Sequence, residues 1–368
     1  MVLSVREDSL FGVCLLATDR SLSPPTLARA VEARGLDMLF FPENSHIPLQ
    51  RKQDWPYAEA LLDPLSRLYD PFVALTAAAT VTERLLLGFG VCLMTHRDPI
   101  NTAKAIASLD LLSGGRVILG IAGGALDEAM RNHGAPFKQR WQIVRDRTLA
   151  MKAIWRDEVA EYHGPFVDFD PLWSYPKPLQ AGGPPIWIGS NSKWVPGRVA
   201  DYADGWIVYN GRYAGDAVHD LRVACDKQGR NFAETTLALM DAPWDAGEAA
   251  GFIEQGYSKL IFLVPPDSGN IEADLDRIAG VVERLRRLWS ARLCCRGPAR
   301  DRRFVIRTCR AHGALLQFQS AANDTSNTPA AVKRARRAGS AIAANSLARA
   351  NACGSPAKSA TRALAGCT

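Results

Sequence analysis

The side chains best suited to proton chemistry lie together in one segment, Phe-Pro-Glu-Asn-Ser-His-Ile-Pro at residues 41–48. Glu43 supplies a carboxylate and His46 an imidazole that titrates near neutral pH, so either could act as a general acid or base. Asn44 can hydrogen-bond a ligand but cannot carry a proton. We take Glu43, Asn44 and His46 as candidate catalytic residues. The competing interpretation of His46 is a solvated loop histidine, because the sequence does not show where it points.

Two glycine-rich segments, at 88–92 and 120–124, each stand at the end of an apolar run. Glycine inside a strand weakens it, so it usually marks a bulge or the close approach of another group. Taken together, the two segments favour a planar cofactor lying against bare backbone, whereas tight turning into a loop is the alternative. The residues assigned to this contact are Gly90, Val91, Gly123 and Gly124.

A third segment, Ile-Gly-Ser-Asn-Ser at 188–192, precedes a helical pattern. Small residues leave backbone N–H groups free there, and the dipole of the helix favours an anion. The pattern predicts that Gly189, Ser190 and Asn191 hold a phosphate of the cofactor. An ordinary N-cap is the alternative, and both can hold at once.

These motifs lie in a chain that alternates apolar runs with helix-period segments up to about residue 288. Strands are predicted at 11–16, 38–41, 85–92, 117–121, 186–188, 205–208, 236–239 and 260–263. Helices are predicted at 26–34, 71–81, 101–113, 141–155, 194–202, 216–228, 245–255 and 272–288. Eight β-then-α units predict an α/β fold, a (β/α)8 TIM barrel, because each parallel strand needs a crossover and closure removes the edges. The alternative, an open doubly wound sheet, lacks its G-x-G-x-x-G segment after the first strand.

In such a barrel the carboxyl ends of the strands carry function and the opposite face carries stability. Ser-Gly-Gly-Arg at 113–116 ends a helix and opens the fourth strand, so it falls on the stability face. We expect a left-handed glycine to cap that helix and Asp110 to pair with Arg116. Two long connections, 42–70 and 161–185, are expected at the active-site face or a subunit interface.

Charge and composition divide the chain into two parts. The whole sequence of 368 residues has a formal charge of +6, but from Ser290 onward fourteen Lys/Arg face two Asp/Glu. The preceding residues carry thirty Lys/Arg against thirty-six Asp/Glu, which gives no basic face for nucleic acid. We therefore predict an oxidoreductase domain at 1–289 and a basic, disordered tail at 290–368, of a composition that out-of-frame sequence would give. A basic arm that binds nucleic acid or membrane is the rival interpretation of the tail.

The cysteines and the apolar runs indicate a cytoplasmic protein. None of the eight cysteines forms a C-x-x-C pair, so we expect neither a metal site nor a disulfide framework. The sequence begins without a leader pattern, and none of its apolar runs has membrane-spanning length.

A series of ordered motifs carries a family resemblance. They are Asp98-Pro99, Ala103-Lys104, the segment 109–116, the segment 119–124, His163-Gly164, Pro176-Lys177-Pro178, the segment 184–189 and the segment 203–206. Jointly they resemble the luciferase-like monooxygenase superfamily and, within it, the branch of oxidoreductases that depend on the deazaflavin coenzyme F420. The likeness runs from about Phe11 to about Leu288.

The resemblance implies a homodimer of barrels with the cofactor ring against strands 3 and 4 and its phosphate near the turn after strand 5. It also implies a non-prolyl cis peptide at Gly90–Val91. Two positions depart from the family pattern. Asn44 stands where many relatives have histidine, and Ala125 stands where relatives often have Trp or Glu, a proton donor in some of them.

The resemblance implies hydride transfer between coenzyme F420 and an unidentified small organic substrate. One alternative is an FMN-dependent luciferase-like monooxygenase supplied by a partner flavin reductase. A second is a catalytically silent barrel that binds cofactor. Trp55, Tyr57 and Tyr69 of the first long connection could wall the pocket or simply pack.

Overall fold

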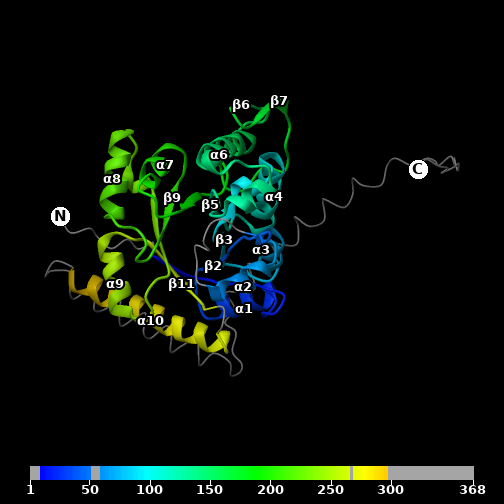
Figure 1. Cartoon of the computed structure of the whole chain (residues 1–368). Helices are drawn as coiled ribbons and strands as arrows, with labels where there is room; N and C mark the ends of the chain where they lie inside the picture. The colour runs from blue at the N-terminus through cyan, green and yellow to red at the C-terminus, as the bar shows by residue number, and fades with distance from the viewer. Residues whose placement is uncertain (1–8, 51–58, 266–267, 297–368) are drawn as a thin grey trace, which may run out of the picture. The chain divides into compact units, whose positions relative to one another are not determined.

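The computed structural model describes residues 9–50, 59–265 and 268–296, and its centre is a closed barrel of parallel strands (Figure 1). The strands of this sheet are β1 (Leu10–Cys14), β2 (Met38–Phe41), β3 (Leu86–Phe89), β4 (Cys92–Leu93), β5 (Val117–Ala122), β8 (Ile186–Gly189), β9 (Gly205–Tyr209), β10 (Thr236–Met240) and β11 (Lys259–Leu263). They follow the order β3-β2-β1-β11-β10-β9-β8-β5, and β3 pairs with β5 to close the ring. β4 resumes the line of β3 after a break and also pairs with β5. The predicted eight-stranded barrel is confirmed.

Helices surround the strands, and each of the eight predicted helices is present. They are α1 (Pro24–Ala33), α3 (Pro71–Ala79), α4 (Pro99–Ser113), α6 (Arg140–Arg156), α7 (Val195–Tyr202), α8 (Ala217–Lys227), α9 (Ala246–Gln255) and α10 (Ile271–Arg296). Additional short elements are η1 (Glu59–Leu61), α2 (Leu62–Ser66), η2 (Met94–His96), α5 (Asp127–Asn132), η3 (Phe137–Gln139) and η4 (Phe232–Glu234). These were not predicted, because one or two turns are too short to show a helical period.

Local sequence explains where the main helices begin. Ser23, Asp70 and Asp98 each accept a hydrogen bond from the first turn of α1, α3 or α4 and are each followed directly by proline. Proline suits the first helical position because its missing N–H would have no partner there. These caps fix the residue at which each helix begins.

The interior of the barrel is filled by large side chains that face glycines. Phe40 and Trp187 stack with ring centroids 6.2 Å apart. A Cβ at Gly88 would lie 2.2 Å from the Phe40 ring, and a Cβ at Gly205 would lie 2.7 Å from the Trp187 ring. The strand glycine Gly88 therefore does mark a close approach, but the approaching group is a core phenylalanine.

The amino-end face is held by saturated hydrogen bonding, and one prediction about it is wrong. Gly114 caps α4 in the left-handed conformation, as expected. Arg116, however, donates to the carbonyl oxygens of Ala79, Thr82, Leu85 and Ser113 and to the Thr82 hydroxyl. Asp110 instead accepts from the backbone and side chain of Gln180. The predicted Asp110–Arg116 pair does not form, because nearer backbone oxygens and a remote loop satisfy both groups.

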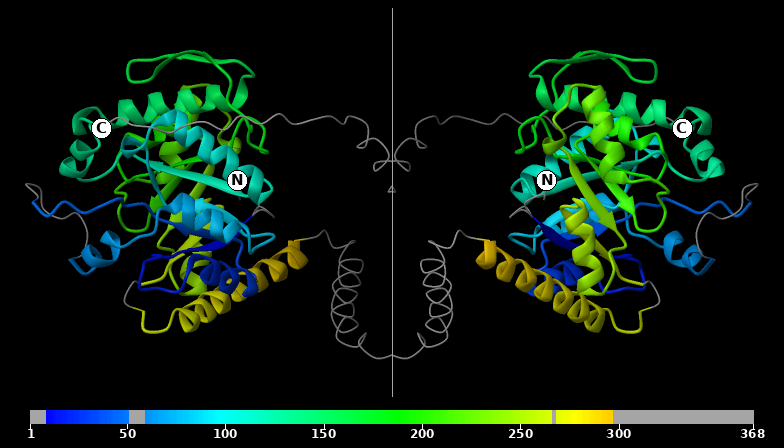
Figure 2. Two further views of the ribbon diagram at one scale, coloured as in Figure 1. Left: turned by 90° about the vertical axis from the view of Figure 1, so that its right-hand side faces the viewer. Right: turned by 90° about the vertical axis from the view of Figure 1, so that its left-hand side faces the viewer.

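The two long connections lie at opposite ends of the barrel. Residues 161–185 pack beneath it through Gln180, which excludes the active-site face for this connection and leaves the subunit interface as the remaining prediction. The first half of this connection carries the antiparallel pair β6 (Ala160–His163) and β7 (Asp168–Leu172), which lies outside the barrel beside α6 (Figure 2). The described part of 42–70 follows β2 and carries η1 and α2.

The chain from 289 onward is described only in part. α10 continues through Arg296, past the boundary expected after residue 289. The disorder expected beyond it concerns 297–368, and Trp55 and Tyr57 lie in 51–58; both segments fall outside the described residues. Within the described ranges, no helix is both long and apolar enough to cross a membrane.

Candidate active site

A cavity of about 360 Å³ opens where the carboxyl ends of the strands meet. Asn44 follows β2, Gly90 and Val91 follow β3, and Asp241 follows β10, so distant segments converge on it. Most of the remaining wall is apolar, with Leu16, Leu61, Leu65, Leu126, Met240 and Leu263. An apolar cavity with a few polar groups at this end of a barrel is the usual setting of a ligand site.

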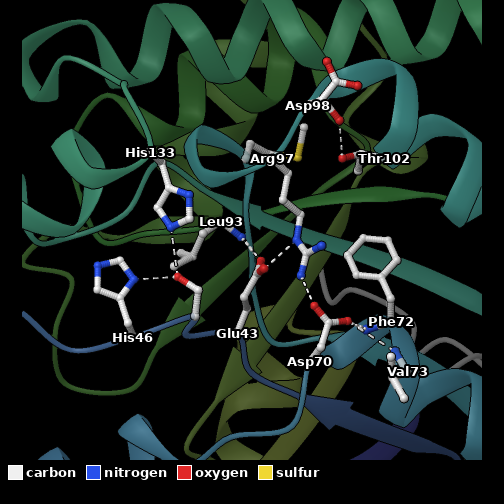
Figure 3. A network of polar contacts seen from close by, with 12 residues as sticks. Glu43, His46, Asp70, Phe72, Val73, Leu93, Arg97, Asp98, Thr102 and His133 are labelled. Atoms are coloured by element: carbon white, nitrogen blue, oxygen red, sulfur yellow. Dashed lines mark hydrogen bonds and ion pairs between the residues drawn. The ribbon is translucent and has the colours of Figure 1, made fainter. Parts of the chain in front are cut away.

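Glu43 lies at the edge of this cavity but is bound tightly to its neighbours. The Leu93 N–H donates to Oε2 at 2.6 Å, and the Arg97 Nε donates to Oε1 at 2.5 Å. Arg97 also pairs with Asp70, which caps α3 (Figure 3). Burial raises the pKa of Glu43, while the charge of Arg97 opposes that shift. The carboxylate thus anchors the segment after β4 to the start of α3.

The other two candidates after β2 separate from one another. Asn44 lines the cavity, whereas His46 is not among the described residues that line it. The Ser45 hydroxyl hydrogen-bonds Nδ1 of His46 and Nε2 of His133, each at 2.9 Å (Figure 3). Asn132 donates to the remaining His46 nitrogen. His46 therefore belongs to a polar cluster beside the cavity.

His96, which sequence reasoning overlooked, is the imidazole in the cavity wall. Both of its ring nitrogens are buried, and neither has a hydrogen-bond partner within the described part of the chain. Its ring stacks on His133 with centroids 4.3 Å apart. Burial, followed by the charges of His133, His46, Arg97 and Arg147, lowers the pKa of His96 to about 4. His96 is therefore neutral at physiological pH.

The glycines assigned to a cofactor occupy different surroundings. Gly90 and Val91 line the cavity, and the bond between them is cis, which confirms the expectation from the family resemblance. A Cβ at Gly123 would touch Arg140 at 3.2 Å. Gly124 has a φ of 80° and faces Met130 and His96, and a Cβ at Gly189 would lie 2.5 Å from Val91.

The turn after β8 is held by its own neighbours. The Ser190 carbonyl accepts from the Trp206 indole at 2.7 Å, and the Asn191 side chain accepts from the Tyr209 N–H at 3.0 Å. Helix α7 begins at Val195, and its N-cap residue Trp194 makes no side-chain hydrogen bond to the first turn. Ser192 accepts from the N–H groups of Trp194 and Val195, and Pro196 has no N–H, so the start of α7 is largely satisfied by its own turn.

Two arginines that the sequence did not single out stand at this end of α6 and α7. Arg140 is the first residue of α6, and Arg198 lies in the first turn of α7. Neither has an acidic partner among the described residues, and Nη1 of Arg198 is buried without any partner. Burial lowers the pKa of both groups, and Arg140 further lowers the pKa of Arg198. The sequence does not indicate that these two arginines form a pair, because the long connection 161–185 separates α6 from α7 along the chain.

A second, larger hollow of about 690 Å³ lies outside the barrel between α8 and α9. It shares Tyr209 and Asn210 with the first cavity. We place the site in the smaller cavity, because the ends of most barrel strands border it and the sequence-predicted Asn44, Gly90 and Val91 line it. The His96 and His133 rings are stacked rather than convergent, and the described residues hold no cluster of three metal-ligating side chains.

Comparison with known proteins agrees with this architecture. The family model described as luciferase-like monooxygenase matches residues 24–242. An uncharacterized protein of Mycobacterium tuberculosis is 34% identical over 77% of this chain and 99% of its own length. The F420-dependent glucose-6-phosphate dehydrogenase of Rhodococcus hoagii is 28% identical over 58% of this chain and 67% of its own. The oxygenase component of flavin-dependent trigonelline monooxygenase from Acinetobacter baylyi is 32% identical over 33% of this chain and 34% of its own.

Solved structures share the fold at low sequence identity. The coenzyme F420-dependent tetrahydromethanopterin reductase of Methanopyrus kandleri superposes with a TM-score of 0.58 at 16% identity, covering 74% of this chain and 97% of that one. A long-chain alkane monooxygenase gives 0.60 at 13% identity, covering 76% and 92%. With the family model spanning more than half of the sequence, the chain belongs to the luciferase-like monooxygenase family.

Proposed function

We propose that this protein is an oxidoreductase that transfers a hydride between coenzyme F420 and a small organic substrate. The observation that carries the proposal is the pair Arg140 and Arg198, two cations without an acidic partner among the described residues, beside the start of α7. Two positive charges held together in a partly buried place repel each other, and a bound anion would offset that repulsion. A phosphate of the cofactor is that anion, and it would bind between these arginines and the Ser190–Asn191 turn.

The cavity suits the ring system of such a cofactor. Gly90 and Val91, which line the cavity, would support the ring from the β3 side. Gly123, Gly124 and Gly189 would complete the contact from the ends of β5 and β8. A bound deazaflavin supplies a hydride or accepts one, and the protein supplies position and electrostatics.

The residues after β2 have distinct proposed roles. Asn44 would orient the ligand through its amide, since it borders the cavity and carries both a donor and an acceptor. Glu43 would fix the wall of the site through Leu93 and Arg97. His46 would exchange protons with solvent through its contact with Ser45.

An FMN-dependent monooxygenase, supplied by a reductase, is the competing function. A phosphate site serves FMN as well as F420, and the match to the trigonelline monooxygenase supports this alternative. The match to the F420-dependent dehydrogenase extends over 229 residues against 124, which supports the deazaflavin. A homodimer and a cytoplasmic location remain predictions of the sequence.

The test is a titration of the full chain with F420, with the deazaflavin chromophore that lacks the phosphate, with FMN and with riboflavin. We expect F420 to bind at least about tenfold more tightly than its phosphate-free chromophore, because charge-assisted hydrogen bonds are the strong ones. Arg198→Leu should remove most of that advantage. Arg156→Leu, at the exposed far end of α6, is the matched control and should retain it.

Two results would count against the proposal. Tight binding of FMN without binding of F420 would replace the hydride-transfer function with the monooxygenase. Equal affinity for cofactors with and without phosphate would remove the arginine site from the proposal.

A further inference from the structure

We propose that the hollow between α8 and α9 is a second ligand site, and that it binds a small compound with one carboxylate on an aromatic body. The hollow has a volume of about 690 Å³ and lies outside the barrel. This inference goes beyond the proposed function, because the site is distinct from the cofactor cavity and its ligand binds without the cofactor.

The first argument is the size of the gap between these two helices. α7 packs closely against α8, whereas α8 and α9 barely touch (Figure 1). Val208 of β9 and Leu239 of β10, which are 3% and 1% exposed, form the floor of the hollow. Voids in protein interiors are seldom larger than a water molecule, whereas ligand pockets measure roughly 300–1,000 Å³. The gap therefore has the size of a ligand site rather than of a packing defect.

The second argument is the aromatic part of the wall. Tyr213 comes from the loop after β9, Phe252 from α9 and Tyr257 from the turn before β11. The rings of Phe252 and Tyr257 stand edge to face, with centroids 5.6 Å apart. The hydroxyl of Tyr213 donates to Asp220 at 2.6 Å, which holds that ring in place. Rings fixed in this way favour the aromatic body of a ligand, because aromatic pairs gain energy beyond the area that they bury.

The third argument is a cation that lacks a counter-ion. Arg222, in the second turn of α8, lines the hollow and is half-buried. Its guanidinium lies 4.8 Å from the centre of the Phe232 ring and makes neither an ion pair nor a hydrogen bond within the described ranges. A guanidinium presents a planar fork of donors that matches the two oxygens of a carboxylate. Arg222 is therefore able to pair with a carboxylate that a ligand brings into the hollow.

The fourth argument is a neutral hydrogen-bond donor in the same hollow. Tyr257 is only 6% exposed, and its hydroxyl makes no hydrogen bond with the residues that the structure describes. Burial, followed by the charge of Asp216, raises the pKa of Tyr257 to about 12. The phenol thus stays protonated at physiological pH and can donate to an oxygen of the ligand.

Asp216 limits the charge that the ligand can carry. Its carboxylate also lines the hollow, and it caps α8 by accepting from the His219 N–H at 3.0 Å. The positive end of the α8 dipole offsets part of that charge. One carboxylate can pair with Arg222, whereas a dianion such as phosphate would add a second charge near Asp216. The hollow therefore suits an aromatic monocarboxylate.

The test compares 2-naphthoate with its neutral isostere 2-naphthamide, by titrating each into the full chain and following the naphthalene fluorescence. We expect the carboxylate to bind at least about tenfold more tightly than the amide, because charge-assisted hydrogen bonds are the strong ones. Arg222→Leu should abolish that preference, and Tyr257→Phe, which keeps the ring, should weaken 2-naphthoate about threefold. Lys227→Leu, which removes an exposed cation from the other end of α8, is the matched control and should keep the preference.

The outcomes separate this site from the cofactor cavity. A thermal unfolding midpoint equal to that of the wild type shows that Arg222→Leu is folded. Equal affinity for the acid and the amide, or survival of the preference in Arg222→Leu, would overturn the site. Displacement of 2-naphthoate by F420, or loss of the preference in Arg198→Leu, would place the acid in the cofactor site and would also overturn the inference. Failure of F420 to bind would refute only the proposed function.

Discussion

The two ends of the barrel use charged side chains in opposite ways. At the amino end, Arg116 distributes five hydrogen bonds among oxygens of its own neighbourhood, and Asp110 is satisfied by Gln180. At the carboxyl end, His96 and Arg198 have buried nitrogens that find no partner within the described ranges of the chain. Arg116 and Asp110 thus hold the amino end together, whereas these two side chains at the carboxyl end have nitrogens for which the described residues supply no partner.

The comparison explains why strong sequence motifs need not mark the site. Ser-Gly-Gly-Arg at 113–116 is among the most distinctive segments of the chain, yet its arginine is consumed by backbone carbonyls. Arg140 and Arg198 lie in no distinctive motif, yet they have no acidic partner among the described residues and are the arginines that we propose hold an anion. In this protein, the role of an arginine is better judged from its hydrogen-bond and ion-pair partners than from the distinctiveness of its sequence motif.

The largest expected effect comes from removing the hydrogen bonds of Arg116 at the amino end of the barrel. Arg116→Ala removes five hydrogen bonds and leaves partly buried carbonyls unpaired, so we expect a loss of about 3 kcal/mol in the free energy of unfolding. Denaturant unfolding measures it, with the exposed Arg29→Ala as control. F420 affinity should be unchanged; a loss of affinity as large as the loss of stability would show that the two ends are not separate.

The next effect tests the unsaturated end through pH. The folded pKa of His96, about 4, lies below its ordinary value of 6.5, so the unfolded chain binds the proton that the folded chain rejects. The contribution of His96 to the free energy of unfolding is therefore fully present above pH 6.5 and is lost as the pH falls toward 4. After allowance for its partial exposure, we expect a loss of about 2 kcal/mol from this group.

His96→Phe is the matched variant for that measurement. Unfolding curves of the two proteins across the same pH window cancel the contributions of all other groups, including the opposing shift at Glu43. The variant should be less sensitive to acid than the wild type. Parallel pH profiles would mean that His96 is not held neutral by the fold.

A smaller effect should come from filling the arginine site with inorganic pyrophosphate. A ligand that binds only the folded state stabilises it by on the order of 1 kcal/mol at about ten times its Kd. We expect the shift in thermal unfolding to be present in Arg116→Ala and absent in Arg198→Leu. Equal shifts in both variants would indicate that pyrophosphate binds elsewhere.

The smallest expected effect is on the stability of Arg198→Leu itself. Removal of a cation that lacks an acidic partner relieves repulsion from Arg140 but also loses its stacking on Trp141. We expect the free energy of unfolding without ligand to change by less than about 1 kcal/mol. A loss as large as that of Arg116→Ala would show that Arg198 is structural.

Much of the architecture followed from the pattern of residues. The run at 38–41 matches β2 residue for residue, and the helix predicted at 71–81 matches α3 to within two residues, because burial on both faces and proline caps are local signals. The cis peptide at Gly90–Val91 was expected from the family resemblance and is present. The pair of Asp110 and Arg116 was also expected but is absent, because Gln180, 70 residues away along the chain, hydrogen-bonds Asp110.

The sequence by itself determined the barrel and its family, because hydrophobic periodicity, capping residues and family motifs are properties of short segments. Only the tertiary structure decided which polar groups are free. It placed His96 in the cavity wall and His46 beside it, and it left Arg140 and Arg198 without carboxylate partners within the described residues. Burial and partnering arise from contacts between distant segments, so neither can be read from the residues next to a side chain.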